Sequence, residues 1–343
     1  YQYTQKAPKT IRPRDNVIVR LCDTESDPTQ PIASPVNSAF RDHLSRWARI
    51  ARNLRVWDYA VTYANPVGMP MPTAQTYGPD YRFYAEHHVE GVFTELEFEI
   101  LADMRDFKIW LMMKQLEDPF ADYTKLVQIF TDGFYGSGGN HVRQYLMDLE
   151  KEAVACRTRS DWNSTPQSLT YLNRSFINQA HQLFDQAEKA VGSDATRLRR
   201  LRHARLPLDR ATLAVHPRLT ADWLGLGKPA GQAPPDRNAT AQRALDTWLV
   251  QAKLRLPESA QETERQHAEA EMRRYAIVTP YAYFFWSWIL QVELDNVFDP
   301  TKPDQKFEVW ARIKFTGPRF PHARPGDRDA IYVERLVLVK TEP

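Results

Sequence analysis

The chain has 343 residues, of which 43% are hydrophobic and 26% charged, and its formal net charge is +2. This composition is typical of a globular protein with a real core, in about two or three domains, and the small net charge gives no reason to expect nucleic acid or an acidic membrane surface as a partner. Two cysteines exclude a disulfide scaffold and a cysteine-rich metal site, and no uncharged apolar run is long enough to span a bilayer, so we expect no metal, no cofactor and no membrane partner.

The first 118 residues alternate between strand-like and helix-like patterns. Residues 17–22 form a β-branched run that predicts a strand, and residues 37–52 repeat apolar groups at helical spacing. Residues 1–4 are interpreted as the stub of an earlier strand. The pattern then continues with strands at 54–59 and 90–94 and with helices at 80–88 and 98–116.

This alternation predicts parallel strands joined by crossover helices. Three or four strands cannot close a (β/α)₈ barrel, which needs about twice as many. The chain starts at Tyr1 rather than at a methionine, so we expect a truncated start. The prediction for residues 1–118 is therefore an α/β fold: the C-terminal half of a (β/α)₈ TIM-type barrel, which lacks the N-terminal half of its own chain.

The rest of the chain predicts two further domains. Helical periodicity dominates residues 119–257 and predicts an α-helical domain. The tail from 258 to 343 is expected to be β-rich, because its apolar residues follow a different period. The strands expected there lie at 282–294, at 307–315, and at 331–333 together with 336–339 as one further strand. We interpret them as a β-sandwich-like region, with pairing of one part to a sheet from the missing half of the chain as the alternative.

Carboxylates stand at the ends of the predicted strands, which is where α/β barrels place their active sites. Asp23 follows the first strand, Asp58 lies at the end of the second, and Glu95 and Glu97 follow the third. Glycoside cleavage needs one carboxylic acid to protonate the leaving oxygen and one carboxylate to activate water or attack the sugar. We predict Asp58 and Glu95 as catalytic residues, and Asp23 and Glu97 as substrate-binding residues.

The same carboxylates have structural interpretations. Asp58 is also suited to cap the turn that follows it. Glu95 and Glu97 suit the first turn of the next helix, where negative charge complements the helix dipole. Asp23 is equally typical of a solvated loop.

Aromatic side chains near these carboxylates are predicted to bind substrate, because flat rings can stack on a sugar. Trp57 and Tyr59 flank Asp58, and Tyr63 lies in the loop that follows. On a regular strand the two flanking rings point to the face opposite Asp58, so core packing is the alternative for Trp57.

Two other patterns are interpreted as structural. The histidine pair at 87–88 is a poor metal site, because adjacent residues on a helix do not face one another. The arginine run at 197–205 resembles a nucleic-acid patch, but leucines interrupt it at helical spacing. We interpret it as a solvated helix face.

Several segments resemble an uncharacterised bacterial family, domain of unknown function 4838. The most specific is Val56-Trp57-Asp58-Tyr59, and the resemblance covers roughly the first half of the chain. It is carried by residues 1–4, 12–17, 53–59, 91–93, 108–119 and 130–136.

That family is similar to glycoside hydrolases of the α-glucuronidase and hexosaminidase kind, which have a barrel and added domains. The resemblance implies that these strands are the last four of the barrel, with Asp58 and Glu95 at the ends of the last two. It also implies a secreted or periplasmic protein. The chain departs from the family at 94–97, where a small residue and an open loop are expected.

We therefore expect a glycoside hydrolase that acts on a polysaccharide or glycuronide by carboxylate acid/base chemistry, incomplete as this chain stands. The alternative is a non-catalytic carbohydrate-binding protein. A third hypothesis is a helical interaction module, which would show an exposed apolar patch on the order of several hundred Å².

Overall fold

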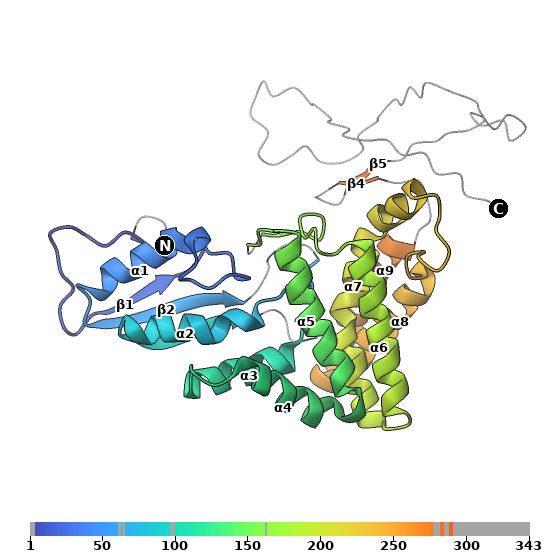
Figure 1. Cartoon of the computed structure of the whole chain (residues 1–343), viewed down its shortest axis with the longest axis horizontal. Coiled ribbons are helices and arrows are strands. Elements are labelled where there is room, and N and C mark those ends of the chain that lie inside the picture. Colours follow the sequence, from blue (N-terminus) through green and yellow to red (C-terminus); the bar gives the residue numbers. More distant parts are fainter. Residues whose placement is uncertain are drawn as a thin grey trace, which may run out of the picture. The chain divides into compact units, whose positions relative to one another are not determined.

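The computed structural model describes residues 4–60, 63, 66–96, 100–161, 163–276, 282–284 and 288–290 (Figure 1). Contacts divide the chain into two units, residues 1–276 and residues 277–343. The predicted domain boundaries after residues 118 and 257 both fall inside the first unit. No helix among the described residues is long and apolar enough to cross a membrane.

The first unit begins with a small parallel sheet. Its strands are β1 (Ile18–Cys22), β2 (Asn53–Ala60) and β3 (Val89–Leu96), hydrogen-bonded in the order β1-β2-β3. Helices α1 (Ser38–Ala48) and α2 (Tyr77–Glu86) connect them. The predicted alternation and the parallel pairing are confirmed, within a few residues at each boundary.

The two faces of this sheet differ. Side chains alternate along a strand, so Leu54 and Val56 share one face and are buried in a cluster that also holds Leu44 of α1 and Tyr84 of α2. Both crossover connections are right-handed and move in the same direction across the sheet, so both helices lie on this face. Neither α1 nor α2 covers the opposite face of the sheet. Phe93, which lies on that face, is 48% exposed.

The remainder of the first unit is helical, and side-chain caps explain where several helices begin. Asp122, Asn173, Asp194 and Asp236 each accept a hydrogen bond from the backbone amide three residues on. The helices are α3 (Arg105–Glu117), α4 (Tyr123–Tyr135), α5 (Gly139–Ala155), α6 (Arg174–Val191), α7 (Ala195–Gly225), α8 (Arg237–Arg255) and α9 (Glu258–Ala276). Short 3₁₀ turns η1 (Pro35–Asn37), η2 (Ala74–Thr76) and η3 (Gly136–Gly138) precede α1, α2 and α5.

Helix α7 is the central element of this helical part. It has 31 residues and includes Pro207 and Pro217, each of which removes one backbone donor from the helix. One side of α7 contributes Leu208 to the cluster that contains the sheet. Another side contributes Leu213 to a second cluster, with Trp248 of α8. The helix therefore joins the two hydrophobic clusters of the unit.

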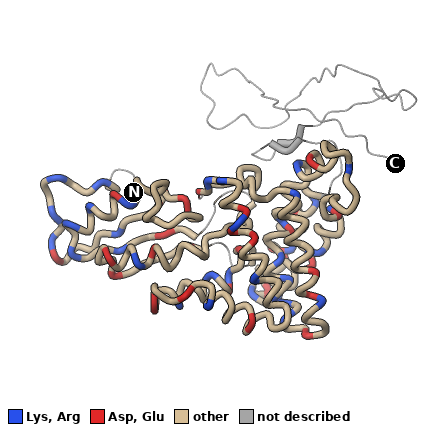
Figure 2. The backbone as a smooth tube through the Cα atoms, in the orientation of Figure 1, with Lys and Arg blue, Asp and Glu red and all other residues tan. Residues whose placement is uncertain are grey.

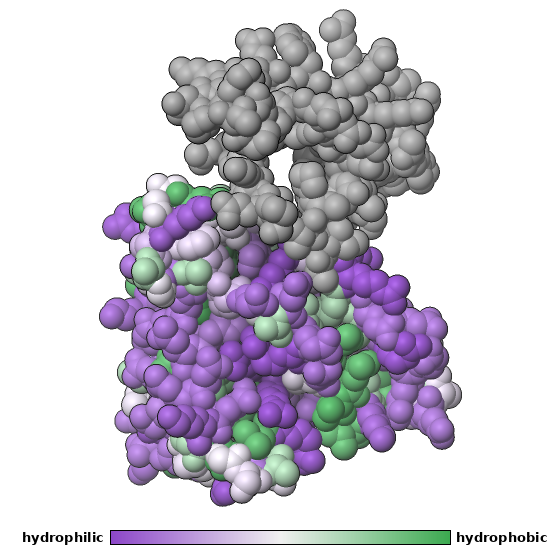
Figure 3. All heavy atoms as spheres, turned by 90° about the vertical axis from the view of Figure 1, so that its right-hand side faces the viewer, coloured by the Kyte–Doolittle hydropathy of each residue, from purple (hydrophilic) through white to green (hydrophobic). Residues whose placement is uncertain are grey.

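The surface of the helices is mostly polar. Figure 2 shows Lys and Arg interspersed with Asp and Glu along the described backbone, in agreement with the net charge of +2. Figure 3, which faces the right-hand side of Figure 1, shows a predominantly hydrophilic surface with small apolar areas. Val250 and Leu254 of α8 are among the exposed apolar side chains.

The predicted fold class is wrong. Among its described residues, the structure has a three-stranded parallel sheet and a large helical bundle, rather than the C-terminal half of a (β/α)₈ TIM-type barrel. Most of the predicted β-sandwich-like tail lies outside the described residues. Parallel strands with crossover helices are common to many α/β folds, so the local pattern does not fix the number of strands.

The predicted β-rich tail also needs correction. Residues 258–276 form the helix α9. In the second unit the structure describes the antiparallel pair β4 (Ala282–Phe284) and β5 (Trp288–Leu290), within the strand expected at 282–294. The strands expected at 307–315, 331–333 and 336–339 lie outside the described residues.

Candidate functional site

The predicted site residues gather near the carboxyl ends of the strands, but on two faces of the sheet. In the register of β2 and β3, Asp58 lies opposite Thr94, and Tyr59 lies opposite Glu95. Side-chain alternation therefore places Asp58 on the helix-covered face and Glu95 on the open face. The structure does not bring this pair into one cleft.

The open face carries a group of rings that we call the aromatic surface: Trp57, Tyr59, Tyr63, Phe93 and Glu95. The rings of Trp57 and Tyr59 are stacked, with centroids 6.3 Å apart and an interplanar angle of 25°. Phe93 meets Trp57 edge-on at 4.8 Å, and Tyr63 meets Tyr59 edge-on at 6.3 Å. Phe93 and Tyr63 are 48% and 46% exposed.

Glu95 accepts hydrogen bonds from two aromatic side chains of this surface. The indole Nε1 of Trp57 donates to Glu95 Oε2 at 3.1 Å, and the Tyr63 hydroxyl donates to Glu95 Oε1. Both carboxylate oxygens thus accept a hydrogen bond from an aromatic side chain, which fixes the direction of the two rings. Glu95 therefore positions the rings.

The helix-covered face ends in what we call the acidic pocket, formed by Asp23, Asp58 and Asp80 with Thr76 and Tyr77. Asp23 directly follows β1, Asp58 belongs to β2, and Asp80 lies in the first turns of α2. The cavity has a volume of about 40 Å³. This volume has room for a few water molecules, but it is far smaller than a typical ligand pocket.

Burial makes these carboxyl groups unusually weak acids. Desolvation, with a smaller contribution from the neighbouring Asp58, raises the pKa of Asp23 to about 7. Desolvation likewise raises the pKa of Asp58 to about 6. The pKa of Asp80 is raised by burial first and then by both other carboxylates. Burial penalises the charged form of each group, so the pocket retains protons near neutral pH.

The three carboxylates also organise the backbone around the pocket. Asp23 Oδ1 accepts hydrogen bonds from the amides of Glu25 and Ser26, at 3.3 and 3.0 Å. Asp80 Oδ1 accepts from the amide of Ile32 at 2.7 Å. Asp58 Oδ1 accepts only from the amide of the next residue among the described contacts. Asp23 and Asp80 thus hold the loop after β1 in place by accepting hydrogen bonds from its backbone amides. Asp58 forms no such hydrogen bond to that loop among the described contacts.

Comparison with known families identifies the segment that carries both features. Residues 1–147 match the model of a family described as a domain of unknown function, DUF4838. We call residues 1–147 the DUF4838 segment. The parallel sheet, the aromatic surface and the acidic pocket all lie in it. No curated protein and no solved structure matches the chain. The match supports the family resemblance and assigns no activity.

The predicted site residues fall into three groups according to where the structure places them. The structure brings Trp57, Tyr59, Tyr63 and Glu95 together on the aromatic surface. It places Asp23 and Asp58 in the acidic pocket. Glu97 lies outside the described residues, so its predicted role stays a prediction. Asp23 is 7% exposed, which excludes the solvated loop as an interpretation.

Phe93 and Asp80 were not among the predicted site residues. Phe93 stands two residues before Glu95 on the same strand, so the alternation rule could have placed it on the same face. Asp80 lies in α2 and has no spacing relationship to Asp23 or Asp58, so only the tertiary structure brings it to the pocket.

The DUF4838 segment offers no metal centre among its described residues. No group of three or more His, Cys, Asp or Glu in the described part of the chain could hold a metal ion. His87 instead contacts Ser45 Oγ through Nε2 at 3.0 Å and the carbonyl of Phe83 through Nδ1 at 2.8 Å.

Proposed function

We propose that the DUF4838 segment binds carbohydrate on its aromatic surface. The observation that carries this proposal is the exposure of Phe93 and Tyr63, about half of each, beside the stacked rings of Trp57 and Tyr59. Flat apolar rings held beside polar atoms complement a sugar ring, which has apolar C–H faces and hydroxyl groups at its edge. The surface also lies at the carboxyl ends of parallel strands, where open α/β sheets bind ligands.

The test is retention of the full chain on a panel of immobilised plant and bacterial polysaccharides. Phe93→Ala should reduce retention because it removes an exposed ring without opening the core. Trp57→Ala should abolish retention because it also releases Glu95. The matched control is Phe120→Ala, since Phe120 is 77% exposed but lies outside the aromatic surface. Unchanged retention of Phe93→Ala and Trp57→Ala would rule out this surface as the binding site.

Glycoside hydrolysis is the second candidate, and the raised pKa values of the acidic pocket favour it. A general acid works best when its pKa is close to the operating pH. Asp23, with a pKa of about 7, is suited to donate a proton, and Asp58, with a pKa of about 6, is mostly ionised at neutral pH. Tyr59 lines this pocket and belongs to the aromatic surface, so the two features adjoin.

This candidate pairs Asp58 with Asp23, because Glu95 lies on the other face of the sheet. Its test is hydrolysis of a panel of aryl glycosides and aryl glycuronides by the full chain, compared with Asp58→Asn and Asp23→Asn. We expect turnover to fall in both variants by at least about a hundredfold, the low end for loss of an acid–base group. Turnover that survives both substitutions would exclude the pocket as a catalytic centre.

A further inference from the structure

The open face of the sheet carries an arginine of β1 beside the aromatic surface. Arg20 lies on this face, because its neighbours Val19 and Leu21 pack into the hydrophobic cluster on the other side. The register pairs Arg20 with Arg55, and Trp57 follows two residues further along β2. At the spacings of a sheet, the Cα atoms of Arg20 and Trp57 are about 8 Å apart. A long side chain spans this distance.

Arg20 has no partner within the part of the chain that the structure describes. Its side chain is exposed and forms no hydrogen bond or ion pair there. Arg55, by contrast, is paired, since its Nε donates to Glu90 Oε1 at 3.0 Å. Its stem lies over Gly91 of β3, so Arg55 points away from β1. Arg20 therefore keeps all five N–H donors of its guanidinium for water or a ligand.

The other carboxylate of the open face is already in use. Glu95 accepts one hydrogen bond at each oxygen from an aromatic side chain. It stands on β3, four positions beyond the residue that aligns with Arg20 across β2. This separation places the Cα atoms of Glu95 and Arg20 about 16 Å apart. The described open face thus combines fixed aromatic rings with one guanidinium that no carboxylate neutralises.

The position of Arg20 is unfavourable for the fold alone. It stands directly beside Arg55 in the register, and like charges on adjacent strands repel one another. The structural alternative is a charge that prevents the edge strand β1 from pairing with another chain. Such a charge has no need to stand next to a second arginine or beside exposed rings. A bound anion, in contrast, would offset the repulsion.

An acidic sugar has the shape and charge that match these groups. Its ring has apolar C–H faces, which pack on aromatic side chains. A uronic acid carries a carboxylate on the edge of this ring, and a sulfated sugar carries a sulfate ester there. With the sugar on the rings, an acidic group that projects over β1 meets Arg20. A guanidinium binds a carboxylate through two parallel N–H···O bonds and binds other oxyanions in a similar way.

We propose that the aromatic surface selects acidic polysaccharides, and that Arg20 is the residue that determines this specificity. The proposal rests on the carbohydrate binding proposed above, and it names the class of glycan that the surface takes. The rings supply most of the affinity, because an exposed ion pair strengthens binding by only about two- to fivefold. Arg20 supplies the preference for sugars that carry a negative charge.

The test compares pairs of soluble oligosaccharides that differ only in charge, by isothermal titration of the full chain. Oligogalacturonate and oligomers of alginate are each compared with their fully esterified, neutral forms. Dextran sulfate and dextran oligomers form the sulfate pair. We expect the acidic member of at least one pair to bind about fivefold more tightly. This preference should vanish near 1 M salt, where the Debye length is about 3 Å. A preference in the uronate pairs alone identifies the carboxylate as the ligand group.

Arg20→Gln should reduce the preference to less than about twofold, because it removes the charge and keeps a polar side chain. Phe93→Ala should weaken the acidic and the neutral member of a pair together, since both stack on the rings. The matched control is Arg49→Gln. Arg49 is an exposed arginine that directly follows α1 on the helix-covered side of the sheet. This variant should keep the preference of the unmodified chain.

The outcomes separate this inference from the proposed function. Equal binding of acidic and neutral members, weakened by Phe93→Ala, would overturn the role of Arg20 and leave carbohydrate binding in place. A preference that survives Arg20→Gln, or that Arg49→Gln removes equally, would also overturn it. Loss of the preference in Arg20→Gln with no effect of Phe93→Ala would contradict the aromatic surface as the binding platform. Failure of every oligosaccharide to bind would overturn both proposals.

Discussion

At the scale of single residues, Asp23 is costly to ionise in the folded chain. Its folded pKa of about 7 lies above the ordinary value of 3.8, because the side chain is buried beside Asp58. The folded state therefore holds a proton between about pH 4 and pH 7 that the unfolded state releases. Stability from this group is complete below about pH 4 and is lost as the pH rises to about 7.

Asp23→Asn removes this ionisation but keeps an oxygen that can accept from the amides of Glu25 and Ser26. We expect the variant to be more stable than the unmodified chain at pH 8, by up to about 4 kcal/mol, at 1.36 kcal/mol for each pKa unit. The difference should shrink towards zero at pH 4. Urea unfolding at several pH values measures it, and the exposed Asp42→Asn serves as control. A difference that grows as the pH falls would contradict the burial of a protonated Asp23.

The alternation of side chains along a strand correctly predicts the faces of β2 but does not by itself relate them to the faces of β3. Trp57 and Tyr59 were expected to oppose Asp58 on a regular strand, and they do. The same rule, applied to β3, places Glu95 with the rings rather than with Asp58. The sequence alone did not show this, because the relation between the faces of two strands depends on their register.

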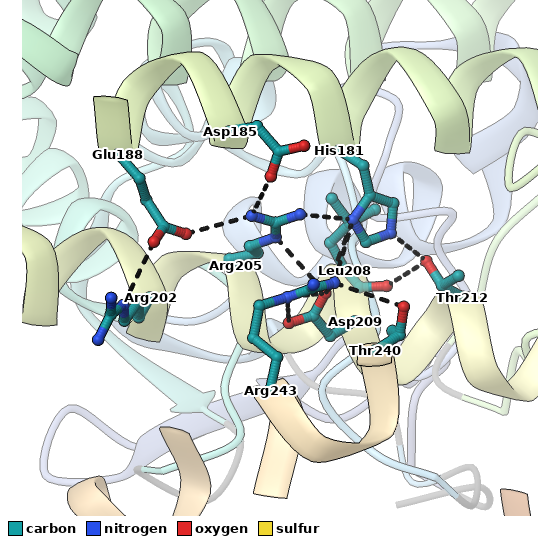
Figure 4. Close-up of polar contacts among 10 residues, drawn as sticks. All are labelled: His181, Asp185, Glu188, Arg202, Arg205, Leu208, Asp209, Thr212, Thr240 and Arg243. Carbon is teal, nitrogen blue, oxygen red and sulfur yellow. Dashed lines mark hydrogen bonds and ion pairs between the residues drawn. The ribbon is translucent and has the colours of Figure 1, made fainter. Parts of the chain in front are cut away.

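At the scale of elements, a buried polar network joins α6, α7 and α8 (Figure 4). Asp209 of α7 is fully buried and accepts from Arg243 of α8 at 2.6 and 3.0 Å. Arg205 donates to Asp185 of α6 at 2.7 Å and to His181 Nδ1 at 3.0 Å. Because a guanidinium only donates, Nδ1 of His181 is an acceptor, and the ring is neutral with its proton on Nε2. Burial, with the nearby arginines, lowers the pKa of His181 accordingly.

Asp209→Ala should destabilise the chain by about 3–5 kcal/mol, because it leaves Arg205 and Arg243 without their shared carboxylate. The comparison is Glu262→Ala, which breaks the exposed pair with Arg265 on α9 and should cost less than about 1 kcal/mol. The free energy of unfolding in urea measures both. Equal losses in the two variants would show that the buried network contributes no more than a surface pair.

The element boundaries of the sheet were predictable, but the environments of the helices were not. The spacing of the arginine run at 197–205 predicts a solvated helix face, yet Arg205 is buried and Arg200 lines a pocket. Their partners, among them Asp185 and Phe134, lie on other helices, and no spacing within α7 reveals them. Helix α3 starts at Arg105, several residues later than predicted, after Met104 in a left-handed conformation.

At the scale of the whole molecule, α7 couples the two hydrophobic clusters of residues 1–276. Leu208 belongs to the cluster that contains the sheet and Leu213 to the other, and both are essentially fully buried. Leu208→Ala and Leu213→Ala should each cost about 2–5 kcal/mol and should lower the midpoint of the same unfolding transition. Circular dichroism and tryptophan fluorescence during urea unfolding of the full chain measure this. Two transitions, each moved by only one of the variants, would contradict the coupling.

The overall fold could be predicted only in part. The α/β order, the parallel pairing and the helical middle follow from periodicity and caps. The number of strands does not, because three parallel strands with crossovers give the same local pattern in a barrel and in an open sheet. Residues 258–276 are helical, although strand-like patterns further along the tail led to a β-rich prediction for them.

The central claim is that carbohydrate binds to the aromatic surface. Its most direct test is the dissociation constant of the full chain for a soluble oligosaccharide from the polysaccharide that retains it best. We expect Phe93→Ala to raise this constant by about tenfold, equivalent to about 1.4 kcal/mol, and Phe120→Ala to leave it unchanged. Equal constants for Phe93→Ala and the unmodified chain, or the absence of saturable binding to every oligosaccharide tried, would contradict it.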